Sequence, residues 1–158
     1  PFLILISILL PVLDYLRRKN KFIKEYYNFL FSIVTRPNES QKLTGGSWVF
    51  IGSSLTLILF PEDIAIVSLF VMSLSDSTAA IIGIKYGRTY LFNKTLEGSM
   101  AFFITTLMII HLLIDIHIYL TITSSLIITF VELLSIKKIN DNFSIPLVTA
   151  LLLHIIIK

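Results

Sequence analysis

One carboxylate, Asp76, lies inside an apolar stretch of the chain, in the segment Leu74–Ala80. A carboxylate surrounded by hydrocarbon is costly unless it is paired, bound to a metal or protonated. Small residues follow it on one stripe of a helix, at Ala79 or Ala80, Gly83 and Gly87. Such a stripe can pack helices together, and glycine also lets a phosphate chain approach the backbone. Both interpretations stay open, as does a purely hydrogen-bonded role for the carboxylate.

The next polar segment, Asn93–Ser99, contains groups suited to phosphate and metal chemistry. Lys94 can neutralise phosphate oxygens, and the hydroxyls of Thr95 and Ser99 can donate to them. Glu97 can hold Mg²⁺, which prefers oxygen ligands. The same segment also fits a capping box before the next helix, with its first residue or Thr95 as the N-cap.

A third group of polar residues follows near the end of the chain. Glu132 stands close to the end of an apolar run, where a carboxylate has little structural reason to be. Asp141 and Asn142 come just before Pro146, which suits the first turn of a helix. Asp141 is therefore either the N-cap of that helix or part of a site.

The composition shows which elements must position these residues. The chain has 158 residues, of which 55% are hydrophobic and only 15% charged, and its mean hydropathy is +0.86. A soluble domain usually carries about 25% charged residues. These values exclude an ordinary soluble domain and a disordered chain. Since the chain has no Cys, a disulfide scaffold, a thiolate metal site and a cysteine nucleophile are excluded too.

The hydropathy pattern predicts an all-α, polytopic integral membrane helix bundle that forms a single transmembrane domain over residues 1–158. Each span needs roughly 20 mostly apolar residues, or fewer with snorkelling flanks. An amphipathic segment with an aromatic face and a basic edge, residues 21–35, predicts a helix in the membrane interface. Because the chain begins at Pro1, already inside an apolar run, we interpret it as a fragment of a longer chain. The six predicted spans are residues 1–16, 43–60, 64–86, 98–114, 116–136 and 143–157.

The distribution of basic residues supports this topology. Of the 13 Lys and Arg residues, all but Lys158 fall in the loops on one side of the predicted membrane. Membrane proteins keep such residues on the cytoplasmic side, so the candidate site residues face the cytoplasm. The net charge of +3 is then explained without a nucleic-acid partner. Arg36, in the first basic loop, is either such a topological charge or a phosphate ligand.

Carboxylates beside Lys and Arg at one membrane face describe a nucleotide or pyrophosphate site. Phosphoryl transfer needs mainly positioning and charge neutralisation, which these residue types supply. A small transporter is an alternative from another class, but its polar groups should line a path through the membrane midplane.

Several motifs resemble those of the dolichol kinase, phytol kinase and CTP-dependent diacylglycerol kinase family. Its core motif is similar to residues 75–80 (SDSTAA), Gly83, Gly87-Arg88 and residues 94–101 (KTLEGSMA). The flanking motifs are similar as well, over about 110 residues in the family's order. They comprise Arg36, Glu39 and residues 43–46 (LTGG) before the second span, and Glu132, Asp141-Asn142 and Ile145-Pro146 near the end.

The resemblance implies an integral membrane kinase that phosphorylates a lipid alcohol (a polyprenol or dolichol, a phytol-like alcohol or diacylglycerol), typically with CTP as donor. It implies that Asp76 and Asp141 hold Mg²⁺ or activate the lipid hydroxyl, and that Glu97 serves the metal. Lys94 and Arg36 would bind the triphosphate. The other residues carried over to the nucleotide site are Gly83, Gly87, Arg88, Thr95, Ser99 and Asn142.

Two departures from the family pattern are visible. Its upstream basic segment of the Arg-Lys-x-x-His type is absent, and Ser75-Asp76-Ser77 replaces the commoner Gly-Asp-Thr/Ala. A CTP:phosphatidate cytidylyltransferase is the nearest alternative, although its His-Gly-Gly and Asp-Arg signature is missing. The sequence leaves open the lipid, the donor nucleotide, the membrane and the oligomeric state.

Overall fold

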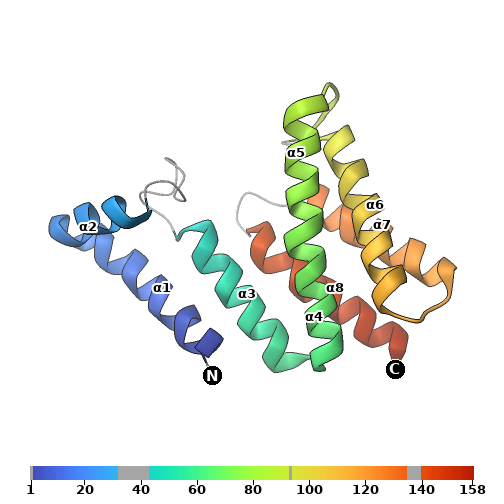
Figure 1. Cartoon of the computed structure of the whole chain (residues 1–158), viewed down its shortest axis with the longest axis horizontal. Coiled ribbons are helices and arrows are strands. Elements are labelled where there is room, and N and C mark those ends of the chain that lie inside the picture. Colours follow the sequence, from blue (N-terminus) through green and yellow to red (C-terminus); the bar gives the residue numbers. More distant parts are fainter. Residues whose placement is uncertain (1, 32–42, 93, 135–139) are drawn as a thin grey trace. The chain divides into compact units, whose positions relative to one another are not determined.

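The protein is helical almost throughout, and the predicted all-α class is confirmed. A computed structural model describes residues 2–31, 43–92, 94–134 and 140–158 (Figure 1). The helices are α1 (Phe2–Lys19), α2 (Lys21–Phe31), α3 (Gly45–Leu59), α4 (Glu62–Phe70), the π-helical segment η2 (Val71–Ser75), α5 (Asp76–Tyr86), α6 (Leu96–Leu113), α7 (Ile118–Leu133) and α8 (Asp141–Ile157). The strands are β1 (Tyr90–Leu91) and β2 (Lys94–Thr95), which pair antiparallel.

Each predicted span coincides with a helix to within a few residues, but six membrane crossings remain a prediction. Two helices in the described part of the chain are long and apolar enough to cross a membrane, Glu62–Tyr86 with 25 residues and Leu96–Leu113 with 18. Three others are apolar but shorter: Gly45–Leu59, Ile118–Leu133 and Asp141–Ile157.

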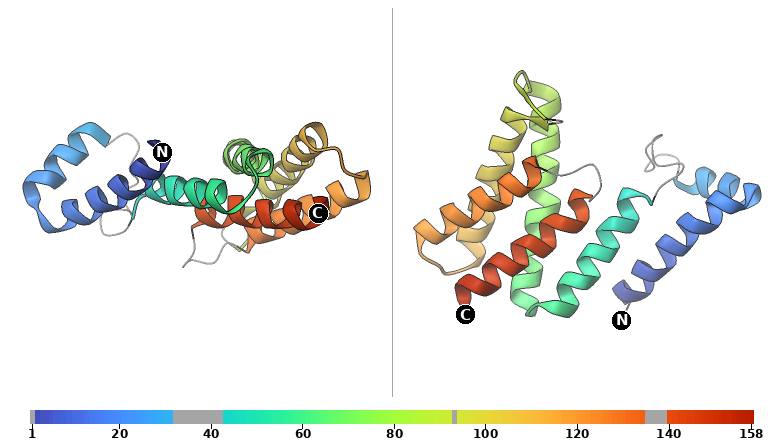
Figure 2. Two further views of the ribbon diagram at one scale, coloured as in Figure 1. Left: turned by 90° about the horizontal axis from the view of Figure 1, so that it is seen from below. Right: turned by 180° about the vertical axis from the view of Figure 1, so that it is seen from behind.

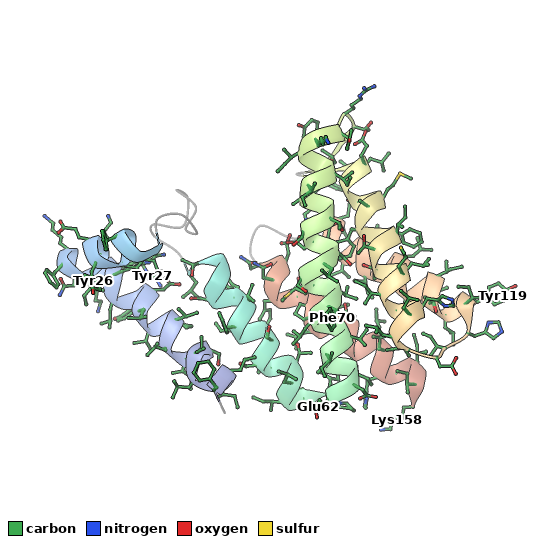
Figure 3. The ribbon with its side chains drawn as sticks, in the orientation of Figure 1. Tyr26, Tyr27, Glu62, Phe70, Tyr119 and Lys158 are labelled. Atoms are coloured by element: carbon green, nitrogen blue, oxygen red, sulfur yellow. The ribbon has the colours of Figure 1, made fainter. Side chains whose placement is uncertain are left out.

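The chain divides into two compact units, Pro1–Ser54 and Leu55–Lys158. In the first unit, α2 packs against α1. Tyr27 is buried, while Phe22, Tyr26 and Phe29, on another stripe of α2, are 76%, 62% and 82% exposed. Tyr26, which is exposed, and Tyr27, which is buried, are both labelled in Figure 3. This open aromatic face agrees with an amphipathic helix, and its place in the membrane interface stays a prediction.

In the second unit, α6 packs between α5 and α7, and α8 packs against both α4 and α7 (Figures 1 and 2). Aliphatic and aromatic side chains from all these helices fill the core. Fully or almost fully buried are Ile64, Val71, Phe102, Ile110, Ile128, Ile145 and Leu153. The outer faces are apolar too, since Ile84, Leu112 and Ile155 are 89%, 74% and 65% exposed. Apolar side chains on both faces are typical of helices surrounded by lipid.

A short hairpin joins α5 to α6. Its strands pair Tyr90 with Thr95 and Leu91 with Lys94, and Phe92 in the turn has a φ of 55°. The hairpin ends where α6 begins, so Lys94 is held directly before the first turn of that helix.

Glycines allow α5 and α6 to approach closely at this end. A Cβ on Gly83 would lie 2.8 Å from Thr95 Oγ1. A Cβ on Gly98 would lie 2.9 Å from both Ala79 O and Thr95 Oγ1. On Gly87 it would collide with the carbonyl oxygen of Gly83. The helix-packing interpretation of this small-residue stripe is therefore confirmed, and the approach of a phosphate chain to it remains a prediction.

We expect Gly98→Ala to lower the free energy of unfolding by about 1–3 kcal/mol, because the added methyl group overpacks the α5–α6 contact. Gly46→Ala is the matched control, since among the described residues its Cβ would meet Thr44 Oγ1 alone, at 3.9 Å. Thermal unfolding in detergent measures both. Equal stability of the two variants would contradict the close packing of α5 on α6.

Candidate active site

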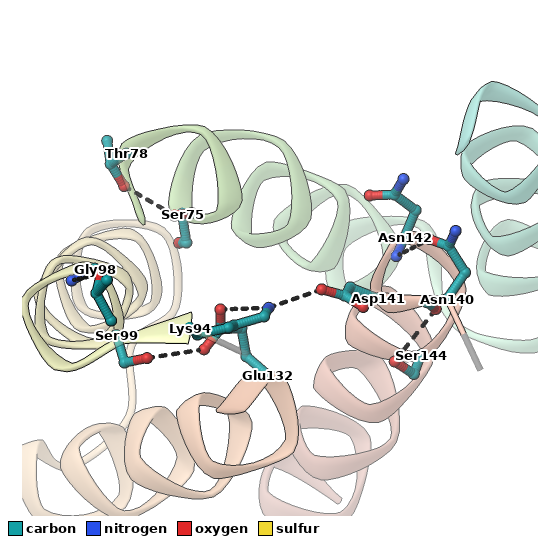
Figure 4. A network of polar contacts seen from close by, with 11 residues as sticks. Ser75, Thr78, Lys94, Gly98, Ser99, Glu132, Asn140, Asp141, Asn142 and Ser144 are labelled. Atoms are coloured by element: carbon teal, nitrogen blue, oxygen red, sulfur yellow. Dashed lines mark hydrogen bonds and ion pairs between the residues drawn. The ribbon is translucent and has the colours of Figure 1, made fainter. Parts of the chain in front are cut away.

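The ammonium group of Lys94 lies between two carboxylates that are distant from it in sequence. Lys94 Nζ donates to Glu132 Oε1 at 2.5 Å and to Asp141 Oδ2 at 2.7 Å. Ser99 Oγ donates to the other oxygen of Glu132, Oε2, at 3.3 Å. Figure 4 shows these four side chains, which we call the Lys94 cluster, converging from separate elements.

The ends of four elements position the Lys94 cluster. Lys94 lies on β2 and Ser99 in the first turns of α6. Glu132 is in the last turn of α7, and Asp141 is the first residue of α8. Because α6, α7 and α8 alternate in direction, the start of α6, the end of α7 and the start of α8 lie at the same end of the bundle.

Asp141 is not the N-cap of its helix, so that alternative is wrong. The N-cap is Asn140, whose Oδ1 accepts from the backbone N–H of Asn142 at 3.1 Å. Asp141 therefore lies within the first helical turn, and its carboxylate pairs with Lys94. An acidic side chain is also stabilised there by the helix dipole.

The members of the Lys94 cluster differ in burial. The side chain of Glu132 is 2% exposed, that of Lys94 21% and that of Asp141 30%. Burial lowers the pKa of Lys94, but its hydrogen bonds to Asp141 and Glu132 outweigh burial, and the pKa rises above its ordinary value. Lys94 is therefore a cation at neutral pH, as a phosphate-binding residue must be.

Asp76 begins α5 directly after the π-helical segment η2 and is partly exposed. Hydroxyl pairs tie its helix to α6 on both sides of it. Thr106 Oγ1 donates to Ser75 Oγ at 3.0 Å, and the hydroxyls of Thr78 and Thr105 are also 3.0 Å apart. π-helical segments are often found at functional sites. Here the segment lies directly before Asp76 and therefore determines the direction in which α5 places that side chain.

Thr95 and Glu97 have local partners in the structure. Thr95 is the N-cap of α6, since its Oγ1 accepts from the Gly98 N–H at 3.2 Å, which confirms the capping interpretation. Glu97 Oε1 accepts from the Thr89 N–H at 3.2 Å. These contacts anchor the hairpin to the start of α6. A metal-binding role for Glu97 stays a prediction that requires its bond to Thr89 to open.

The predicted magnesium ligands do not form a preassembled site. Among the residues that the structure describes, no three His, Cys, Asp or Glu side chains are grouped as they would be around a metal ion. Glu132 and Asp141 nevertheless face a common cation, the ammonium of Lys94. Oxygen donors of this kind suit Mg²⁺, and a role of Asp141 as its ligand stays a prediction.

The remaining candidates lie around this end of the second unit or outside the described residues. Gly87 follows α5, Arg88 is exposed beside it, and Asn142 lies in the first turn of α8. Arg36 falls outside the residues that the structure describes.

A buried polar network in the first unit was not predicted. Asp14 is fully buried, and its Oδ2 accepts from Thr44 N at 2.8 Å, Thr44 Oγ1 at 2.9 Å and Ser47 Oγ at 2.6 Å. Arg17 Nε lies 3.1 Å from the other carboxylate oxygen. The Arg17 guanidinium in turn stacks over the ring of Tyr27, 4.5 Å from its centroid.

A sequence signal for this network exists. Asp14 lies within the apolar run of the first predicted span, which is the same argument that singled out Asp76. Arg17 counts as a loop charge in the sequence, yet it is 4% exposed on α1. The network joins α1, α2 and the start of α3.

Comparison with known proteins identifies relatives along almost the whole chain. The uncharacterized protein RP860 of Rickettsia prowazekii is 32% identical over 157 residues, which cover 92% of this chain and 76% of the relative. CTP-dependent diacylglycerol kinase 1 of Saccharomyces cerevisiae is 27% identical, covering 99% of this chain and 63% of the yeast protein. The enzyme of that name from Schizosaccharomyces pombe is also 27% identical, over 82% of this chain and 68% of its own length.

No solved structure and no protein-family model matches the chain. The chain spans somewhat under two thirds of the S. cerevisiae kinase. The identity and coverage shared with RP860 show common family membership, and the two kinase alignments show a more distant relationship. The chain therefore belongs to one family with RP860, and it is related to the CTP-dependent diacylglycerol kinases of the two yeasts.

Proposed function

We propose that the chain is an integral membrane kinase that transfers the γ-phosphoryl group of CTP to the hydroxyl of a lipid alcohol. The Lys94 cluster is the observation that carries the proposal, because it joins a protonated lysine to two carboxylates from three separate motifs. The names of the two yeast relatives favour CTP as donor and diacylglycerol as acceptor. Polyprenols, dolichol and phytol-like alcohols present the same hydroxyl and are the other acceptors to test.

In the proposed reaction, the lipid hydroxyl oxygen forms a bond to the γ-phosphorus while the bond from that phosphorus to the β,γ-bridging oxygen breaks. CDP leaves, and the hydroxyl proton passes to a carboxylate, for which we propose Asp76. Lys94 neutralises charge on the phosphate oxygens, where preorganised cations contribute most to catalysis. Ser99 donates a further hydrogen bond.

Mg²⁺, if bound by Asp141 with Asp76 or Glu97, would supply further charge neutralisation on the triphosphate. We propose that Arg36, Arg88 and Asn142 bind the nucleotide. The backbone at Gly83, Gly87 and Thr95 would line the same nucleotide site.

We propose that the helices span the membrane six times with the Lys94 cluster at the cytoplasmic face. The outward apolar side chains of the second unit support a lipid environment. The ends of the helices that carry the Lys94 cluster adjoin the loops that hold Lys and Arg, as the positive-inside rule requires. The α2 helix would lie in a membrane interface.

The direct test uses protein expressed from its full reading frame and purified in detergent. It is incubated with Mg²⁺, CTP labelled in the γ-phosphate and, in separate reactions, diacylglycerol, polyprenol, dolichol and phytol. We expect labelled product with diacylglycerol. Asp76→Asn should reduce the rate by about 10²–10⁴-fold, the usual contribution of a general base. Asp63 is an exposed residue at the start of the helix Glu62–Tyr86, away from Asp76. The control variant Asp63→Asn should have the same rate as the wild type. No labelled lipid from any acceptor would refute the proposal.

A further inference from the structure

The two carboxylates that hold Lys94 are not equivalent. Glu132 is 2% exposed and Asp141 is 30% exposed. We propose that Glu132 is a positioning residue that keeps Lys94 in the site, and that Asp141 is an exchangeable partner which the phosphates of the nucleotide displace from Lys94. This inference rests on the proposed function and extends it to the way in which the nucleotide enters.

Separating Glu132 from Lys94 would have a high free-energy cost. Both of its oxygens are engaged, Oε1 by Lys94 and Oε2 by Ser99. It lies in the last turn of α7, near the end of the helix dipole that disfavours a carboxylate. A buried carboxylate that loses the cation paired with it is strongly destabilised. Lys94 therefore stays with Glu132 when the phosphates arrive.

Asp141 can release Lys94 at little cost. It is the most exposed member of the cluster, so water can solvate its carboxylate. It also occupies the first turn of α8, where the helix dipole favours a negative charge without any cation. In the structure its Oδ2 occupies one of the positions around Nζ at which a phosphate oxygen would bind. Asp141 thus competes with the nucleotide, and its release leaves a free carboxylate beside the bound phosphates.

If phosphate displaces Asp141 from Lys94, then Asp141→Asn and Glu132→Gln should change the affinity for CTP in opposite directions. Asp141→Asn removes the competitor, so CTP should bind about 3–10-fold more tightly. Of the two carboxylates that the structure shows on Lys94, Glu132→Gln leaves only Asp141 charged, so CTP should bind about 10-fold more weakly. A merely electrostatic effect of removing a negative charge would tighten binding in both variants. The probe is CTP in EDTA, measured by equilibrium dialysis of the detergent-solubilised protein.

Asp115→Asn and Glu62→Gln are the matched controls, because both residues are exposed at the other end of the second unit, and they should bind CTP as the wild type does. Figure 3 shows Glu62 at that end. If Glu132→Gln fails to fold, the test rests on the double variant Lys94→Met/Glu132→Gln, which removes the buried carboxylate together with its cation. In that background Asp141→Asn should no longer tighten binding, since the gain depends on Lys94.

The outcomes separate this inference from the proposed function. If the wild type transfers the γ-phosphate but both substitutions shift CTP binding in the same direction, only the exchange is refuted. A gain from Asp141→Asn that persists in the Lys94→Met/Glu132→Gln background refutes it equally. Absence of CTP binding by the wild type, both in EDTA and in Mg²⁺, would overturn the exchange and the proposed function together.

Discussion

Replacing Lys94 by Met should lower kcat/KM for CTP by about 10²–10³-fold, the loss expected when one preorganised electrostatic group is removed from a phosphoryl-transfer site. Lys94 is the cation of the Lys94 cluster, and Glu132 and Asp141 both bind it directly. Steady-state transfer from labelled CTP to diacylglycerol measures the effect. Lys94→Arg keeps the charge but changes its geometry, so it should retain more activity than Lys94→Met.

A loss of folding could imitate this result, because Lys94→Met leaves the buried Glu132 without its cation at a cost of about 3–5 kcal/mol. The double variant Lys94→Met/Glu132→Gln separates the two effects. It should recover most of the lost stability, since the buried carboxylate is neutralised together with its cation, but it should stay inactive. Activity near the wild-type level in the folded double variant would show that Lys94 has only a structural role.

Asp14→Ala should lower the free energy of unfolding by about 3–5 kcal/mol, the range for breaking a buried ion pair. The substitution removes the acceptor of three hydrogen bonds from Thr44 and Ser47. It also leaves Arg17, which is 4% exposed, without the carboxylate that faces it. Thermal unfolding in detergent measures the loss, with circular dichroism to follow the helices.

Two variants define what Asp14 contributes. Asp14→Asn keeps an oxygen that can accept from Thr44 and Ser47, so it should be less destabilising than Asp14→Ala. Asp115→Ala removes an exposed carboxylate and should change stability by no more than about 0.5 kcal/mol. If Asp14→Ala were as mild as Asp115→Ala, the buried network would not hold the first unit together.

The helices could be predicted because their cause is local. Runs of apolar residues between charged loops determine where each helix begins and ends, and the break around Asp115 between α6 and α7 was visible in the sequence. The same holds for Thr95, whose capping role depends on Gly98 three residues later. Hydropathy alone does not decide whether every helix crosses a membrane. Helices as short as α3, α7 and α8 span it only if the bilayer is thin enough or adapts to them.

The contacts within the site could be predicted only in part. The sequence singled out Glu132 because a carboxylate near an apolar run needs a partner. It singled out Lys94 as a group suited to phosphate binding and Asp141 as either an N-cap or a site residue. It could not show that they bind one another, since Glu132 and Asp141 are 38 and 47 residues from Lys94. Glu97 illustrates the converse. Its predicted metal role came from residue type, whereas its contact with Thr89 depends on the hairpin between them.

We propose that the γ-phosphate of CTP reaches a lipid hydroxyl through the Lys94 cluster. Parallel reactions of the purified protein with diacylglycerol or phosphatidate, containing CTP labelled in either the α- or the γ-phosphate, test this transfer. We expect labelled phosphatidate from diacylglycerol with γ-labelled CTP only, and its loss in Lys94→Met. Label entering phosphatidate from the α-phosphate would mean cytidylyl transfer and would overturn the proposed kinase activity.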